Sequence, residues 1–229
     1  MIDPIYEQDG ITIYNADCRE VIPAIAGVDL LLTDPPYSEQ VHNGARTRTE
    51  GASSEKLVTF ESFDPVETLM SIECSGWMVA TMDYQHVAAI GQNGNLTRFG
   101  VWVKPNSCPQ LTGDRPATGF EAVAICWRGA GRMKWNGGGS RAVWTENRVN
   151  ADLHPTQKPV ALFREWVRLF SSPGDIVFDP FMGSGTTLVA AKMEGRRAVG
   201  IERNAEYCAK AVERLRQGVL PFSVKGARR

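Results

Sequence analysis

The sequence of 229 residues contains few cysteines and histidines, and their spacing argues against a metal site or a disulfide framework. The five cysteines are an odd number and include no C-x-x-C pair, so neither a zinc site nor a set of disulfides is supported. The three histidines, at positions 42, 86 and 154, are scattered along the chain. We therefore expect no metal cofactor and a reducing compartment such as the cytoplasm.

The sequence also lacks long hydrophobic runs. No apolar segment approaches the length that spans a membrane, and the first residues do not resemble a signal peptide. We therefore expect an intracellular protein without a membrane partner. Hydrophobic residues still make up 43% of the chain, which is enough for residues 1–229 to form one α/β domain with a full core.

A large net charge is missing too, since the formal net charge is −1. This average hides a division along the chain. Residues 1–97 carry 4 basic and 15 acidic groups, whereas residues 98–168 carry 11 and 5, and residues 192–229 carry 10 and 4. Such a division is typical of a protein with one face that meets phosphate groups, although an ordinary solvated surface also accommodates it.

Strand and helix patterns alternate along the chain and predict a doubly wound α/β fold with a mostly parallel, seven-stranded sheet. Hydrophobic periodicity predicts strands near residues 11–15, 28–33, 76–81, 98–104, 121–127, 176–179 and 197–201. It predicts helices near residues 18–25, 64–73, 84–90, 159–171, 185–194 and 204–217.

The segment Asp34-Pro35-Pro36-Tyr37 follows a buried strand and combines groups that suit a planar amine. Asp34 can accept a hydrogen bond from an exocyclic N–H, and Pro35 can offer its carbonyl rigidly because Pro36 restricts it to extended geometry. Tyr37 offers a face on which a base can stack. A strand that simply ends in a proline turn is the alternative interpretation.

A second segment, from Asp179 to Leu188, is typical of a nucleotide-binding turn. Its glycines, Gly183 and Gly185, allow close approach of a ligand to the backbone, and the N-terminus of the following helix favours an anionic group. The dinucleotide fingerprint G-x-G-x-x-G fails because Leu188 stands at its third glycine. Acids also follow two other expected strands, at Asp17 and Glu202, although a lone acid in that place often caps a helix.

Together these segments resemble the S-adenosylmethionine-dependent amino-methyltransferases of DNA. The resemblance is to the permuted (beta) class, in which the D-P-P-Y half precedes the cofactor half. The matching elements occur in the order of that class: Asp17-Cys18, Asp34 to Tyr37, His154-Pro155-Thr156-Gln157-Lys158-Pro159, Asp179 to Thr187, and Glu202. The resemblance implies the circularly permuted methyltransferase fold, in which the strands that end at Asp34 and Asp179 lie side by side.

The resemblance also implies roles for individual residues. Glu202 would bind the ribose of S-adenosylmethionine, Asp17 with Cys18 the adenine, and Thr156 or Lys158 would lie near the carboxylate, with His154 in the same closing segment. The methionine part would be surrounded by Asp179, Phe181, Gly183, Ser184, Gly185, Thr186 and Thr187. Asp34, Pro35, Pro36 and Tyr37 would hold a flipped adenine for N6 methylation, with S-adenosylhomocysteine as the product. The expected partner is double-stranded DNA, the expected source a bacterium or phage, and a homodimer is an option.

Two polar stretches interrupt the predicted scaffold. Residues 38–63 directly follow Tyr37, so we expect a mobile loop beside the target base. Residues 129–153 mix basic and aromatic side chains and form a short candidate DNA-recognition segment, for which a long surface hairpin is the alternative. The expected DNA contacts are Arg128, Arg132, Lys134, Trp135, Arg141, Trp144 and Arg148.

Other activities stay open at this point. Cytosine has an equivalent exocyclic amine, so N4-cytosine methylation is the nearest alternative, although in this family D-P-P-Y favours adenine and S-P-P-Y favours cytosine. Methylation of RNA or of protein glutamine is associated with N-P-P-Y, against which Asp34 argues. A catalytically dead nucleic-acid-binding homologue is the last alternative, and the intact Asp34, Tyr37, Gly183 and Gly185 argue against it.

Overall fold

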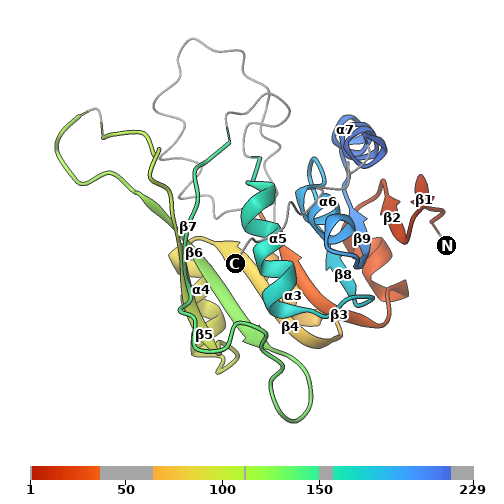
Figure 1. The fold of residues 1–229 in the computed structure, drawn as a ribbon, viewed down its shortest axis with the longest axis horizontal. Helices are drawn as coiled ribbons and strands as arrows, with labels where there is room; N and C mark the ends of the chain where they lie inside the picture. The colour runs from red at the N-terminus through yellow and green to blue at the C-terminus, as the bar shows by residue number, and fades with distance from the viewer. Residues whose placement is uncertain (1, 37–63, 111, 150–156, 218–229) are drawn as a thin grey trace, which may run out of the picture.

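A mostly parallel β-sheet runs through the centre of the protein, with helices on both of its faces (Figure 1). The computed structural model describes residues 2–36, 64–110, 112–149 and 157–217. Across these residues, nine strands follow the spatial order β1-β2-β9-β8-β3-β4-β6-β5-β7. Their bounds are β1 Tyr6–Gln8, β2 Ile11–Tyr14, β3 Val28–Thr33, β4 Cys74–Met82, β5 Arg98–Val103, β6 Phe120–Trp127, β7 Val143–Thr145, β8 Ile176–Asp179 and β9 Arg197–Ile201.

The seven strands predicted from the sequence are all present, and the expected α/β fold is confirmed. Strands β2, β9, β8, β3 and β4 are mutually parallel, while β6 runs antiparallel to both of its neighbours, β4 and β5. The prediction missed two three-residue edge strands, β1 and β7. With them, the number of strands in the described residues is nine, compared with the seven predicted. Both are too short to show a clear two-residue periodicity in the sequence.

The predicted helices are also present, with ends that differ by a few residues. Their bounds are α1 Cys18–Val21, continued by the 3-10 turn η1 Ile22–Ala24, then α3 Pro65–Ser71, α4 Tyr84–Gln92, α5 Val160–Phe170, α6 Thr186–Met193 and α7 Ala205–Arg216. The side chains of Asp64, Asp83 and Asn204 accept hydrogen bonds from first-turn N–H groups and so begin α3, α4 and α7. Within the described residues, no helix has the length and apolarity needed to cross a membrane.

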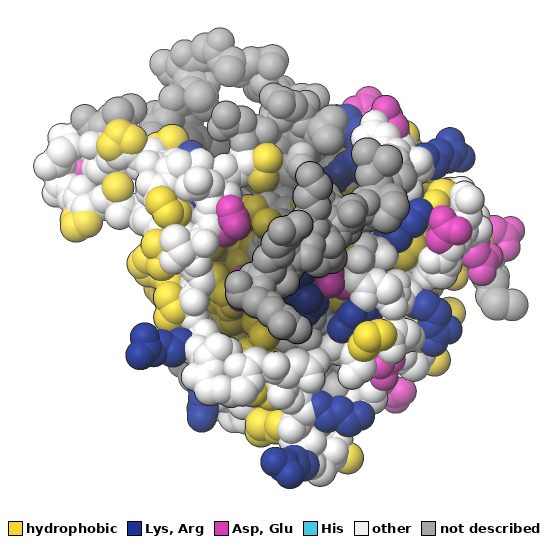
Figure 2. Space-filling model, viewed as in Figure 1, with side chains coloured by type: hydrophobic (Ala, Val, Ile, Leu, Met, Phe, Trp, Pro, Cys, Tyr) yellow, Lys and Arg dark blue, Asp and Glu magenta, His cyan; other side chains and the backbone are white. Residues whose placement is uncertain are grey.

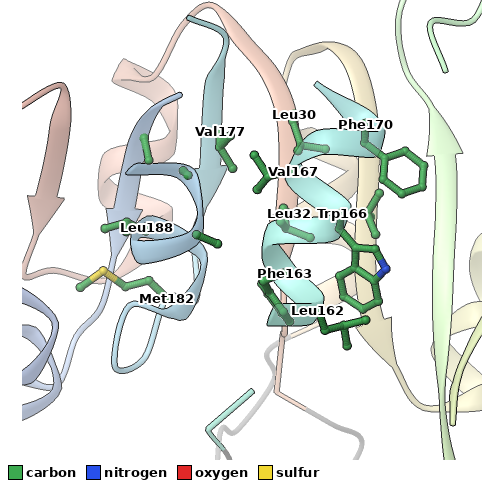
Figure 3. Close-up of a cluster of buried hydrophobic side chains, with 14 of the residues drawn as sticks. Leu30, Leu32, Leu162, Phe163, Trp166, Val167, Phe170, Val177, Met182 and Leu188 are labelled. Carbon is green, nitrogen blue, oxygen red and sulfur yellow. The ribbon is translucent and has the colours of Figure 1, made fainter. Parts of the chain in front are cut away.

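The core has two parts because successive residues of the central strands point to opposite faces of the sheet. Leu30 and Leu32 face the layer formed by α5, α6 and α7, whereas Leu31 faces the layer formed by α1, α3 and α4. Figure 3 shows side chains of α5, among them Phe163 and Val167, directed toward β3 and β8. Five residues of α5 are buried there: Leu162, Phe163, Trp166, Val167 and Phe170.

The strand directions decide which connections can meet at a ligand site. Because β3, β4 and β8 are parallel, their C-terminal ends share one edge of the sheet, which we call the C-terminal edge. Antiparallel β6 begins at this edge, where Ala122 pairs with Met82, and ends at the opposite edge, where Trp127 pairs with Trp77. The connection from β5 to β6 therefore lies at the C-terminal edge, while the connection from β6 to β7 lies at the opposite edge (Figure 1).

Candidate active site

The two motif-bearing strands, β3 and β8, are direct neighbours. Leu30 pairs with Val177 and Leu31 with Phe178, in parallel register. At the strand ends, the Thr33 hydroxyl donates a hydrogen bond of 2.6 Å to Oδ1 of Asp179. The D-P-P segment and the glycine turn therefore begin next to each other at the C-terminal edge, as the resemblance implied.

Asp34 is the first residue after β3, and its carboxylate already has two donors in the free protein. The Thr81 hydroxyl, near the end of β4, donates to Oδ1. The Lys158 ammonium lies 2.5 Å from Oδ2. Burial raises the pKa of Asp34, the positive charge of Lys158 opposes this, and the negative charge of Glu121 adds to it. The following Pro35 is buried, so the segment leaves the strand along a fixed path.

Lys158 makes a contact that differs from the one we expected. Its ammonium lies against Asp34, and 3.5 Å from Oε2 of Glu121, whereas we expected it near the carboxylate of the cofactor. Burial alone lowers the pKa of a lysine, but the carboxylates of Asp34 and Glu121 raise it, and the net direction is upward. The backbone carbonyl of Lys158 accepts a 3.4 Å hydrogen bond from the hydroxyl of Thr186, the first residue of α6.

The glycine turn between β8 and α6 has the backbone that only glycine adopts without strain. Gly183 and Gly185 have φ values of 50° and 79°. A Cβ on Gly185 would lie 2.8 Å from Cβ of Ala211 on α7, so a larger residue at this position is excluded by a steric clash as well as by the backbone conformation. The turn therefore brings the N-terminus of α6 to the C-terminal edge with no side chain at that position.

Asp179 and Arg214 both stabilise the glycine turn through hydrogen bonds. The Asp179 carboxylate, which is 3% exposed, accepts hydrogen bonds from the hydroxyls of Thr33 and Thr187 and from the N–H of Phe181. Burial raises the pKa of Asp179 to about 6, against the effect of these donors. Arg214 of α7 donates to the Ser184 carbonyl at 2.6 Å, to the Ser184 hydroxyl at 3.2 Å and to the Thr186 hydroxyl at 3.3 Å.

Asp17 and Glu202 follow the neighbouring strands β2 and β9 and are brought together by backbone hydrogen bonds. The Glu202 carbonyl accepts from the N–H of Ala16 and from the side-chain amide of Asn15. Asp17 caps α1 and forms a 2.6 Å ion pair with Arg19, and this contact lowers the pKa of Asp17. Burial raises the pKa of Glu202, whose Oε1 accepts a hydrogen bond from the N–H of Asn204.

Cys18, which we expected beside the cofactor, is 7% exposed and packs in the core under α1. Burial raises the pKa of its thiol to about 11, so it stays protonated near neutral pH. Tyr37, His154 and Thr156 lie outside the described residues, as do residues 38–63 and 150–153 of the two polar stretches. Within the described part of the chain, no group of three or more His, Cys, Asp or Glu side chains could hold a metal ion.

The expected DNA contacts do not lie on one surface. Arg132, Lys134, Trp135 and Arg141 belong to the connection from β6 to β7, at the edge of the sheet opposite Asp34. Asn136 in this connection donates to the carbonyls of Arg168 and Ser171, at the C-terminal end of α5, which confirms its position. In Figure 2, Lys and Arg side chains are dispersed among Asp and Glu on the visible face of the described residues, not gathered into one patch.

Two of those expected contacts serve the fold. Trp144 is 5% exposed and packs edge-on against Trp166, so the prediction that it stacks on a base is wrong. Arg128 donates hydrogen bonds to the carbonyls of Met70 and Ile72 and thereby ties the end of β6 to α3. Arg148, by contrast, is exposed and follows β7, where its backbone N–H and carbonyl both bond to the side chain of Asn106.

The sequence interpretation missed several polar residues of this site. Thr81, Glu121 and Lys104 lie at the ends or beginnings of strands that reach the C-terminal edge, and Arg214 lies on a helix after the glycine turn. The rule applied to Asp17, Asp34 and Glu202, that polar side chains at strand ends meet at one edge, also finds Thr81. It did not find Glu121, because the antiparallel direction of β6 places a strand beginning at that edge.

Comparisons with known proteins agree with this arrangement of a doubly wound sheet and two adjoining motifs. The family model described as DNA methylase, for N6 and N4 methyltransferases, matches residues 28–213. The chain therefore belongs to the N6/N4 DNA methylase family.

Individual relatives point the same way. The type II methyltransferase M.HinfI of Haemophilus influenzae is 29% identical over a match that covers 90% of this chain and 68% of that protein. M.XycI of Xanthomonas campestris pv. cyanopsidis is 39% identical, but the match covers 50% of this chain and 42% of that protein. The structure of M1.HpyAVI in complex with SAM superposes with a TM-score of 0.68 at 27% identity, covering 90% of this chain and 98% of that one. The PvuII cytosine-N4-specific methyltransferase shares the fold, with a TM-score of 0.69 at 16% identity and coverage of 97% and 91%.

Proposed function

We propose that the protein transfers a methyl group from S-adenosylmethionine to N6 of adenine in double-stranded DNA and releases S-adenosylhomocysteine. The observation that carries the proposal is the hydrogen bond from Thr33 to Asp179, because it joins the strand end that bears Asp34 to the one that bears the glycine turn. Membership of the DNA methylase family supports it, as does the likeness to M1.HpyAVI, whose structure contains SAM.

The residues at the C-terminal edge fit such a cofactor. Gly183 and Gly185 leave the start of α6 open, and free N–H groups at a helix N-terminus suit the carboxylate of the methionine part. Glu202 offers a carboxylate to the ribose hydroxyls and Asp17 offers one to the adenine amino group. When bound, the cofactor supplies an electrophilic methyl group on its sulfonium. We assign Phe181, Ser184 and Thr186 to its surroundings, and Asp179 with Thr187 to shaping the turn.

Asp34 and Pro35 form the proposed clamp for the target amine. One amine hydrogen bonds to the Asp34 carboxylate, each oxygen of which can accept more than one hydrogen bond, and the other bonds to the Pro35 carbonyl. The amine nitrogen is then held with its lone pair free for in-line attack, and the carboxylate stabilises the positive charge that grows on it. The base must leave the duplex to reach this clamp, and Tyr37 is the proposed stacking partner.

The experiment that tests the proposal identifies the methylated base. DNA treated with the protein and S-adenosylmethionine is digested to nucleosides, which are separated by chromatography and identified by mass spectrometry. We expect N6-methyladenine. N4-methylcytosine would transfer the proposal to the cytosine amine, which uses the same clamp, and the absence of any methylated nucleoside would reject it.

Asp34 provides the first prediction on mechanism. Asp34→Ala removes the side-chain acceptor of the clamp, so we expect methylation to fall below detection while the Kd for S-adenosylmethionine, measured by calorimetry, stays within about a factor of two, as for a distant and independent site. Glu213→Ala, at an exposed position of α7, is a control for general damage. An Asp34→Ala protein that still methylates DNA would show that the clamp is assigned to the wrong group.

For DNA contact we propose the surface at the C-terminal edge formed by the connection from β5 to β6 and the segment after β7, in place of Arg132, Lys134, Trp135 and Arg141. Asn106 and Arg148 are exposed and bonded to each other there, which makes one surface from two segments. Arg115, in the connection from β5 to β6, adds a second exposed guanidinium to this surface. A base held by Asp34 lies at this edge, so we expect phosphate contacts here.

A further inference from the structure

A row of alternating charges runs away from Asp34 across the C-terminal edge. The Asp34 carboxylate lies 2.5 Å from the Lys158 ammonium, which lies 3.5 Å from Oε2 of Glu121, whose Oε1 in turn lies 3.1 Å from the Lys104 ammonium. The four groups come from different segments: the ends of β3 and β5, the start of β6 and the segment that precedes α5. Their side chains are between 8% and 23% exposed.

This geometry is more than a surface ion pair. A buried ammonium is costly unless it is paired and hydrogen-bonded, and Lys158 meets that requirement by lying between two carboxylates. Glu121 is in turn held by Lys104, so it cannot turn away from Lys158 without leaving a second charge uncompensated. The Asp34 carboxylate is therefore fixed by Thr81 on one oxygen and by Lys158 on the other.

We propose that Lys158 and Glu121 are positioning residues for the Asp34 carboxylate: Lys158 keeps it ionised and aimed at the target amine, and Glu121 holds Lys158 in place. This inference rests on the proposed function and adds to it, because the clamp needs an acceptor and a protonated Asp34 oxygen would be a donor. Lys158 acts by its positive charge beside Asp34. Glu121 acts in the opposite sense on Asp34, while it holds Lys158 in place.

The charged groups that face Asp34 give signed expectations for pH dependence. Lys158 lowers the pKa of Asp34 and Glu121 raises it, Asp179 is a further carboxylate that interacts with Asp34, and Lys104 pairs with Glu121. Lys158→Met should therefore move the acid limb of the kcat against pH profile to higher pH, by about one unit or more, as expected for loss of an opposite charge in contact. Glu121→Gln should move the same limb to lower pH. A merely structural role does not shift the limb in opposite directions.

A second measurement does not depend on methylation. The carboxyl carbon of Asp34, followed by ¹³C NMR in the free protein, should titrate at higher pH in Lys158→Met and at lower pH in Glu121→Gln than in the original protein. Lys192→Met is the matched control, because it removes a lysine of α6 that pairs with Asp9, between β1 and β2, and it should leave the titration unchanged. Calorimetry with S-adenosylmethionine should give the same Kd for Lys158→Met, because the ammonium pairs with Asp34 and Glu121.

The outcomes separate the inference from the proposed function. Opposite shifts of the Asp34 titration support the inference even if the substrate proves to be another amine. Unchanged titration in both variants, or loss of cofactor affinity in Lys158→Met, overturns it and returns Lys158 to the carboxylate of the cofactor. If Lys158→Met does not fold, the isosteric Glu121→Gln still decides the question, since an unchanged titration in that variant contradicts the inference.

Discussion

Asp34 and Asp179 lie at the ends of neighbouring strands, and their carboxylates have different hydrogen-bond partners. Asp34 accepts a hydrogen bond from the Thr81 hydroxyl and pairs with the Lys158 ammonium, whereas Asp179 accepts hydrogen bonds from two hydroxyls and one backbone N–H. The sequence presents both simply as an acid before a proline. Only their hydrogen-bond partners distinguish the acid that we propose as the acceptor for the target amine from the acid that supports a turn.

Asp179 gives a prediction on stability. Its pKa is raised by burial from an ordinary 3.8 to about 6, so the folded state holds the proton more tightly than the unfolded state. The associated stability is present below about pH 4 and is lost as the pH rises through 6. At about 1.4 kcal/mol for each unit of difference, the loss is on the order of 2–3 kcal/mol. Urea unfolding between pH 4 and pH 7 should show this decline in the original protein.

Asp179→Asn is the comparison for that experiment. Its amide does not ionise, so the free energy of unfolding should decline less with rising pH than in the original protein, although the substitution disturbs one hydroxyl contact at every pH. The readout is therefore the difference between the two pH profiles and not the stability at one pH. Parallel profiles would show that the ionisation of Asp179 is not coupled to folding.

Glu202 gives a prediction on cofactor binding. Glu202→Ala removes the carboxylate proposed for the ribose hydroxyls, and two hydrogen bonds to a charged group amount to about 3 kcal/mol, or roughly a hundredfold in Kd. Burial raises the pKa of Glu202, so this carboxylate becomes protonated at a higher pH than an ordinary glutamate. As the pH is lowered, the affinity of the original protein for the cofactor should therefore begin to fall at a correspondingly higher pH. Calorimetry with S-adenosylmethionine measures both. The control is Glu213→Ala, on the exposed side of α7, and equal affinities in the two variants would refute the ribose assignment.

At the scale of elements, the two connections of β6 provide a test of where DNA lies. Arg148→Ala and Arg115→Ala remove exposed guanidinium groups at the C-terminal edge, so each should weaken binding to all DNA sequences and lower the slope of log affinity against log salt by about 0.9 for each lost phosphate contact. Arg132→Ala and Arg141→Ala, at the opposite edge, are matched controls that should change neither quantity. Filter binding over a salt series measures them, and the reverse pattern would restore the connection from β6 to β7 as the recognition segment.

The elements themselves were largely predictable, because buried strands and amphipathic helices have strong periodic signals. The seven longer strands and the helices were expected near their observed ranges, and family membership supplied the adjacency of β3 and β8. The direction of β6 was not predicted, and it decides which loops lie near Asp34. Without that direction, basic residues of the connection to β7 could not be assigned to the far edge, nor Glu121 to the site.

Trp144 and Lys158 show the same limit at single positions. A tryptophan among glycines and arginines has the composition of a nucleic-acid contact, but β7 pairs with β5 and turns Trp144 into the core against Trp166. Lys158 was assigned by its place in a motif, whereas its contact with Asp34 joins residues 124 positions apart. Long-range contacts of this kind depend on the topology of the sheet and have no local signal in the sequence.

At the scale of the whole molecule, the sheet is continuous from β2, β9 and β8, which lead to the proposed cofactor residues, to β3 and β4, which lead to the proposed clamp. Apolar residues of β3 and β8 share one core with α5 and α6, as Figure 3 shows for Leu30, Leu32 and Val177. The strands that carry the cofactor residues and those that carry Asp34 are therefore expected to unfold together. A ligand that binds only the folded state then stabilises the entire described domain and not one half of it.

The last prediction follows from this coupling. S-adenosylmethionine at about 100 times its Kd should stabilise the protein by roughly 2.7 kcal/mol, which for a domain of this size raises the Tm of a single transition by roughly 5–10 °C. Asp34→Ala should show the same rise, because Asp34 faces the target amine, while Glu202→Ala at the same ligand concentration should show a much smaller one. Differential scanning calorimetry measures all three proteins. Two separate transitions, only one of them shifted by the ligand, would mean that β3 and β8 do not join the halves into one cooperative unit, and loss of the rise in Asp34→Ala would mean that Asp34 belongs to the cofactor site.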